Sequence, residues 1–213
     1  HANKPSTSPS VFEWLTKLFE QNSIDPAQLW NDIQNVADKK LVKRNALVLR
    51  GPPNCFKSQL FRLLLQPLNI APMTRSGNQN HFWLQSLLTQ DLCLWEEPMI
   101  TTNNAQDWKL ILEGAPIKVC VKNQPDEILE RTPFFITSNH HLGKEINKKD
   151  CNALKERYIE YHFHTQIDND KVQGRFPACP QMIMPHDLYR FFCNASGRPS
   201  PIVTDQEQEE NAQ

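Results

Sequence analysis

Residues 51–58 read Gly-Pro-Pro-Asn-Cys-Phe-Lys-Ser. This stretch matches a phosphate-binding loop, Gly-x-x-x-x-Gly-Lys-Ser/Thr, except that Phe56 stands where the second glycine belongs. Residues 45–50 have the pattern of a buried strand, and residues 59–65 have that of an apolar helix. In such a strand–loop–helix unit, backbone amides and the positive end of the helix bind nucleotide phosphates. The sequence therefore predicts a nucleotide site in an α/β fold.

Each part of this loop has its own expected role. The ammonium of Lys57 would reach the β- and γ-phosphates, and the hydroxyl of Ser58 would be a ligand of Mg²⁺. Phe56 is a departure, because glycine tolerates unusual backbone angles and lets the chain approach the phosphates closely. A phenylalanine fits if its ring points away from the nucleotide, and otherwise it weakens binding. The other predicted nucleotide contacts of the loop are Gly51, Pro52, Pro53, Asn54 and Cys55.

The composition limits what the chain can be. A length of 213 residues with 39% hydrophobic residues predicts one domain of moderate size with a small appendage. A net charge of −1 means that any contact with nucleic acid has to be local. The six cysteines include no Cys-x-x-Cys pair and fit a reducing compartment. No apolar stretch approaches the roughly 20 residues that span a bilayer, so we expect a soluble protein with no membrane partner.

The chain divides into four expected parts. Residues 1–10 are rich in serine and proline, and residues 195–213 are polar, so both ends are expected to be mostly disordered. Residues 11–44 predict two helices, the second capped by Asp25 with Pro26 at its first position. Residues 45–194 form the α/β part and end in a helix at 185–194. Its expected strands are 45–50, 91–96, 117–122, 133–138 and 158–164.

Two of these strands end in polar side chains. Glu96 and Glu97 follow an apolar run at 92–95, and Asn139 follows the strand at 133–138. Glu96 would complete the Mg²⁺ shell with Ser58, and Glu97 would orient and activate the attacking water. Asn139 would bind the γ-phosphate or that water. The alternatives are two surface glutamates before a turn, and a helix N-cap or Asx-turn at the asparagine.

The order of these motifs resembles that of the superfamily 3 helicases over roughly residues 40–165. The Trp-Glu-Glu and Thr-Pro-x-x-Ile-Thr-Ser-Asn strings are most similar to the large non-structural protein of parvoviruses. The Gly-Pro-Pro-Asn string and residues 80–85 are similar to the papillomavirus helicase. The resemblance implies an AAA+ P-loop ATPase core with a central, mostly parallel sheet, preceded by a helical oligomerisation segment at 11–44. It also implies ATP and Mg²⁺ as cofactors, a ring that is usually hexameric, DNA in the central channel, and the host nucleus as location.

The resemblance assigns further residues. Lys122 matches the hairpin lysine that projects into the channel and contacts DNA, together with Lys118. Copies of these lysines gathered by symmetry would form a basic collar on a nearly neutral subunit. Arg157 matches the arginine finger that reaches the γ-phosphate bound by the adjacent subunit. Its alternative role is a salt bridge with Glu156 or Glu160.

The sequence thus predicts an ATP-driven DNA helicase motor domain of a viral replication protein. An alternative is a DNA-binding scaffold that binds nucleotide but hardly hydrolyses it, because of Phe56. A monomeric P-loop kinase fits less well, because no arginine-rich lid occurs between residues 66 and 90. Zinc is not expected, because the histidines and cysteines lack the paired short spacing of a structural zinc site.

Overall fold

The computed structural model describes residues 10–73, 82–168 and 175–198. Within these ranges the elements follow the order α1 (Val11–Gln21), α2 (Pro26–Ala37), β1 (Ala46–Arg50), α3 (Lys57–Leu65), β2 (Ile70–Met73), the 3₁₀ turn η1 (Gln85–Leu87), β3 (Leu92–Glu96), α4 (Ala105–Glu113), β4 (Ile117–Val119), β5 (Glu127–Leu129), β6 (Phe134–Ser138), α5 (Lys148–Lys155), β7 (Tyr158–His162), β8 (Ile167–Asp168), β9 (Phe176–Pro177) and α6 (Pro185–Ala195).

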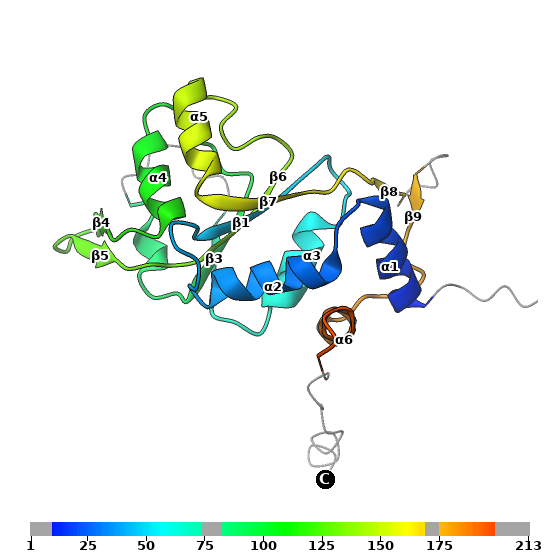
Figure 1. Ribbon diagram of the computed structural model, residues 1–213. Helices are drawn as coiled ribbons and strands as arrows, with labels where there is room; N and C mark the ends of the chain where they lie inside the picture. The colour runs from blue at the N-terminus through cyan, green and yellow to red at the C-terminus, as the bar shows by residue number, and fades with distance from the viewer. Residues whose placement is uncertain (1–9, 74–81, 169–174, 199–213) are drawn as a thin grey trace, which may run out of the picture.

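The centre of the fold is a five-stranded parallel sheet with the order β2-β3-β6-β1-β7. Helices cover both of its faces, with α4 and α5 on one side and α2 and α3 on the other (Figure 1). Side chains of β1 alternate between two apolar clusters, with Leu47 and Leu49 in one and Ala46 and Val48 in the other. Burial on both faces explains why the central strands are continuous apolar runs. The predicted α/β fold with a parallel sheet is confirmed.

The predicted helices and the strands at 45–50, 91–96 and 133–138 are confirmed within one or two residues. The strand predicted at 117–122 is wrong in extent, because β4 ends at Val119 and pairs only with β5, as an antiparallel hairpin outside the central sheet. The strand predicted at 158–164 ends at His162, where pairing with β1 stops. The sequence pattern did not indicate β2, which lies at the sheet edge and contains Pro72, nor the polar helix α5.

The ends of the chain fall largely outside the described residues, which include neither 1–9 nor 199–213. Ser10, expected in the disordered end, is the N-cap of α1, and its side chain accepts a hydrogen bond from the Glu13 amide. Helix α6 continues to Ala195, one residue into the expected tail. Part of the 80–85 string also lies outside the described residues. No helix among the described residues has the length and apolar character that crossing a membrane requires.

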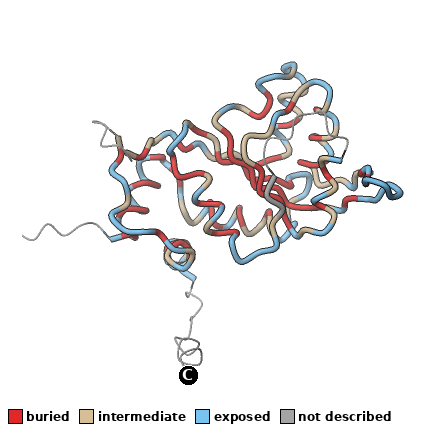
Figure 2. The backbone as a smooth tube through the Cα atoms, turned by 180° about the vertical axis from the view of Figure 1, so that it is seen from behind, coloured by how far each residue is buried: buried red, intermediate tan, exposed pale blue. Residues whose placement is uncertain are grey.

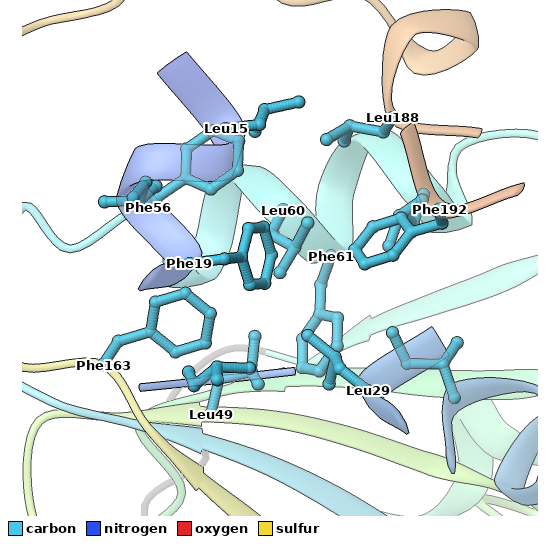
Figure 3. Close-up of a cluster of buried hydrophobic side chains, with 14 of the residues drawn as sticks. Leu15, Phe19, Leu29, Leu49, Phe56, Leu60, Phe61, Phe163, Leu188 and Phe192 are labelled. Atoms are coloured by element: carbon cyan, nitrogen blue, oxygen red, sulfur yellow. The ribbon is translucent and has the colours of Figure 1, made fainter. Parts of the chain in front are cut away.

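The two N-terminal helices share the core of the sheet. Phe19 from α1 contacts the rings of Phe163 and Phe192, and Leu29 from α2 is fully buried. Figure 3 shows Phe19 and Leu29 in one cluster with Phe61 of α3. Residues 11–37 are therefore packed onto the α/β part, while their role in oligomerisation stays a prediction.

Candidate nucleotide site

The loop between β1 and α3 adopts a backbone that glycine would favour. Phe56 has a φ of 71° and Asn54 a φ of 60°, both in the left-handed region. The Phe56 ring is buried and packs edge-on against Trp14 of α1, with ring centroids 5.5 Å apart. Figure 3 shows Phe56 beside Leu15 in the apolar cluster. The ring is therefore part of the core, which explains how phenylalanine is accommodated at this position.

Gly51 begins the loop and allows a close approach of two backbones. A Cβ atom at this position would lie 1.6 Å from the carbonyl oxygen of Phe163, just after β7. The Phe163 amide donates to the Arg50 carbonyl at 2.7 Å, which holds the two segments together. Any side chain at residue 51 would force the start of the loop away from the sheet.

Lys57 is the first residue of α3, directly after the loop. Its Nζ donates to the carbonyl oxygens of Gly51 at 2.8 Å and Pro52 at 2.6 Å, and to Oδ1 of Asn139 at 3.3 Å. Burial lowers the pKa of Lys57, and the nearby Cys55 and Glu97 act in the opposite direction. The ammonium is thus a partly desolvated positive charge that the loop and the end of β6 hold between them.

The first turn of α3 has no capping side chain. Its N-cap is Phe56, which makes no side-chain hydrogen bond to the amides of the turn. The first amides of a helix need acceptors from outside the helix, and phosphate oxygens are well suited to this role. The uncapped turn and the adjacent Lys57 ammonium together form an environment for an anion.

The two glutamates at the carboxyl end of β3 are held differently. Glu97 has a φ of 51°, and its carboxylate accepts hydrogen bonds from the Asn139 amide at 2.8 Å and the Ser138 hydroxyl at 3.4 Å. Glu96 accepts a hydrogen bond from Nη2 of Arg62 at 3.0 Å. Both carboxylates therefore make specific contacts at the carboxyl edge of the sheet, although each remains partly exposed.

Asn139 connects the lysine to the second glutamate. Its side chain accepts from Lys57, and its backbone amide donates to Glu97. The alternative of a helix N-cap is wrong, because the next helix is capped by Asn147. The structure thus brings Lys57, Glu97 and Asn139 into one hydrogen-bonded group.

A cleft of about 810 Å³ opens in front of this group, a size that suits a nucleotide. One wall is the phosphate loop with Lys57, Glu97 and Asn139. The other wall, which the sequence did not predict, comes from α1, from β8 and from the segment before α6. This wall includes Trp14, Ile167, Ala178, Cys179, Gln181, Met182 and Ile183. The Trp14 indole donates to the Pro177 carbonyl at 2.7 Å and so joins α1 to that segment.

The residues present fit an Mg²⁺ ion that would be coordinated by a few protein oxygens together with phosphate oxygens. Within the described ranges, no group of three or more histidine, cysteine, aspartate or glutamate side chains could hold a metal ion. Mg²⁺ commonly takes one or two protein oxygens and completes its shell with phosphates and water. Oε1 of Glu96 is buried and makes no hydrogen bond with any described residue, and the Ser58 hydroxyl lies 3.4 Å from that of Thr137 at the end of the neighbouring strand.

Arg157 lies outside the cleft. Its guanidinium forms an ion pair with Glu113 at the end of α4, with an N–O distance of 3.0 Å, and also donates to the Ala153 carbonyl. The predicted alternative, a salt bridge with Glu156 or Glu160, is wrong about the partner. Glu160 instead accepts from Arg50 at 3.0 Å.

The two candidate DNA-binding lysines lie in the β4–β5 region. Lys118 forms an ion pair with Asp126 across the hairpin at 3.2 Å, and Lys122 is exposed in the turn. Figure 1 shows the hairpin standing away from the sheet, on the side opposite to α1 and α6, and Figure 2 shows its exposed tip. The structure therefore separates these lysines from the phosphate loop within one subunit.

A parallel sheet covered on both faces, with a phosphate loop after β1, carboxylates at the end of β3 and an amide after β6, defines a P-loop α/β core. The chain belongs to the parvovirus non-structural protein NS1 family, whose family model matches residues 2–187. The predicted resemblance to the parvovirus protein is thus confirmed.

Two relatives illustrate this membership. The initiator protein NS1 of Aedes densonucleosis virus (strain GKV 002 002) is 34% identical over 189 residues, which cover 84% of this chain and 22% of the relative. The initiator protein NS1 of Aedes albopictus densovirus (isolate Boublik/1994) is 32% identical over 162 residues, which cover 75% of this chain and 20% of the relative. The chain therefore spans about a fifth of the length of these relatives.

A solved structure of the NrS-1 C-terminal region (305–718) is similar to this chain in fold. It has a TM-score of 0.51 at 16% sequence identity and covers 92% of this chain and 45% of that one. At this identity the likeness supports the α/β architecture alone.

Proposed function

We propose that this chain is the ATP-dependent DNA helicase motor domain of a viral replication initiator protein. The observation that carries the proposal is the hydrogen-bonded group of Lys57, Asn139 and Glu97, which faces a cleft of about 810 Å³ beside the uncapped start of α3. The initiator proteins to which the chain is similar support the assignment to DNA replication. The motor would work as a ring on DNA in the host nucleus, with ATP bound between subunits.

Each residue of the group has a distinct role in this proposal. Lys57 and the amides of the loop would hold the phosphates, and Asn139 would contact the γ-phosphate. Glu97 would orient and activate the attacking water, because its carboxylate is fixed by the Asn139 amide close to Lys57. Ser58 and Glu96 would hold Mg²⁺, which when bound neutralises charge on the phosphates.

The test is ATP hydrolysis by this chain, measured with and without single-stranded DNA at several protein concentrations beside a mass measurement. We expect DNA to stimulate turnover, and turnover per subunit to rise with the assembled fraction. A chain that shows no affinity for ATP or ADP would contradict the proposal. Nucleotide binding with negligible turnover would instead favour the scaffold.

The proposed arginine finger gives a prediction of its own. Arg157→Ala is expected to lower turnover of the assembled protein by about 1,000-fold, because arginine fingers stabilise charge on the transferring phosphoryl group. Nucleotide affinity of the unassembled chain should stay unchanged, since Arg157 lies outside the cleft of its own subunit. Steady-state ATPase assays and a binding titration measure the two quantities.

The matched control is Glu113→Gln, which breaks the same ion pair but keeps the arginine. If Arg157 acts through the pair with Glu113, both variants should lose activity equally. Full turnover in Arg157→Ala would show that the finger lies elsewhere.

The hairpin lysine gives a further prediction. Lys122→Ala should weaken single-stranded DNA binding and reduce the slope of log affinity against log salt by about 0.7 for each phosphate that the lysine neutralises. Lys118→Ala should have the smaller effect, because Asp126 already pairs with Lys118. Fluorescence anisotropy with a labelled oligonucleotide over a salt series measures both, and an unchanged slope in both variants would remove the hairpin from the DNA path.

A further inference from the structure

Arg62 enters the candidate site from the first turns of α3. It lies four residues after Ser58, so the two side chains share one helix face. That face looks toward the ends of β3 and β6, since Ser58 Oγ lies 3.4 Å from Thr137 Oγ1 and Arg62 Nη2 lies 3.0 Å from Glu96. Glu96 and Thr137 are paired neighbours in the sheet. The guanidinium thus occupies the same crevice as the two groups that would hold Mg²⁺.

The ion pair between Arg62 and Glu96 is one that another cation could replace. The Arg62 side chain is 66% exposed and that of Glu96 is 28% exposed, so solvent screens their attraction. Glu97, in contrast, is tied to a backbone amide of the sheet edge at 2.8 Å. Oε1 of Glu96 lies 3.0 Å from the same Arg62 nitrogen but makes no hydrogen bond with any described residue. One carboxylate is therefore fixed by the fold, and the other is held by a replaceable cation.

We propose, building on the function proposed above, that Arg62 is a positioning residue that competes with Mg²⁺ for Glu96. A carboxylate that neutralises a guanidinium attracts a second cation less strongly, so the pair must loosen before Glu96 can serve the metal. Arg62 also lines the cleft that contains Lys57, so a released guanidinium would remain beside the phosphates. In this way Arg62 sets the Mg²⁺ concentration that tight nucleotide binding requires.

The test is the affinity for ADP carrying a fluorescent methylanthraniloyl group, measured over a series of free Mg²⁺ concentrations. Arg62→Ala is expected to lower the half-saturating Mg²⁺ concentration by about two- to fivefold, the range that an exposed ion pair contributes. Arg62→Lys should stay close to the unchanged chain, because it keeps the positive charge. When Glu96 is already replaced by glutamine, adding Arg62→Ala should leave the half-saturating Mg²⁺ concentration unchanged. Arg190→Ala, an exposed arginine of α6 that does not line the cleft, is the matched control.

Thermal unfolding of each variant verifies that it is folded before the titration is interpreted. An unchanged or raised Mg²⁺ requirement in Arg62→Ala would overturn the competition, and so would a shift that persists in Glu96→Gln. If the unchanged chain binds labelled ADP and only the Mg²⁺ shift is missing, this inference fails while the proposed function stands. If the unchanged chain binds no labelled ADP at any Mg²⁺ concentration, both fail.

Discussion

Lys57→Ala is expected to lower nucleotide affinity by about 100-fold and to remove measurable ATP hydrolysis. The substitution deletes the ammonium that contacts two loop carbonyls and Asn139, and it leaves the phosphates without their central positive charge. Loss of one partner of a buried, charged hydrogen-bonded pair costs about 2–5 kcal/mol, which corresponds to a factor of roughly 30 to several thousand. A titration with fluorescent ADP and a steady-state ATPase assay measure the two effects.

The control for this variant is Lys17→Ala, which removes an exposed lysine from α1 and should leave both quantities unchanged. Because Lys57 also ties the loop to β6, its removal is expected to loosen the loop. Nucleotide affinity is therefore compared at a temperature where circular dichroism shows both proteins fully folded. Unchanged affinity in Lys57→Ala would mean that phosphate is bound somewhere other than this loop.

The sequence predicted the centre of the fold because the relevant signals are local. The strands that become β1, β3 and β6 are short apolar runs, and each ends in the residues that form the site. The carboxyl ends of neighbouring parallel strands meet at one edge, so Lys57, Glu97 and Asn139 had to lie close together once the sheet was predicted.

Other features depended on tertiary packing. Arg157 pairs with Glu113, a residue far away in the sequence that only the α4–α5 arrangement brings near. The role of Arg62 depends on the register between α3 and β3, although its four-residue spacing from Ser58 is a signal that could have been noticed. The direction of the Phe56 ring could not be read from the loop, because it is decided by Trp14 on α1.

Phe56→Gly is expected to destabilise the chain by about 2–3 kcal/mol. Deleting a buried phenylalanine side chain costs about 3–5 kcal/mol, and relief of the left-handed backbone returns about 1–2 kcal/mol. For a chain of this size, the loss corresponds to a fall in Tm of roughly 5–10 °C. Thermal unfolding followed by circular dichroism measures this fall in Tm. Phe56→Leu, which keeps an apolar side chain, should have a Tm between those of the unchanged chain and Phe56→Gly. An unchanged Tm in Phe56→Gly would show that the ring contributes nothing to the core.

The same variant separates the motor from the scaffold, provided that turnover is expressed per folded molecule. Because the Phe56 ring points into the core and the loop still holds Lys57 against Asn139, we expect glycine to leave turnover within about threefold of the unchanged chain, a difference below about 1 kcal/mol in the barrier. Near-zero turnover in the unchanged chain, restored by glycine, would instead identify the aromatic residue as the inhibitor of hydrolysis and favour the scaffold. Turnover in Phe56→Gly that falls well below that of the unchanged chain would give a third outcome. It would show that the contact between Phe56 and Trp14 keeps the phosphate loop in the conformation that hydrolysis needs, so that the packing of α1 supports the catalytic site.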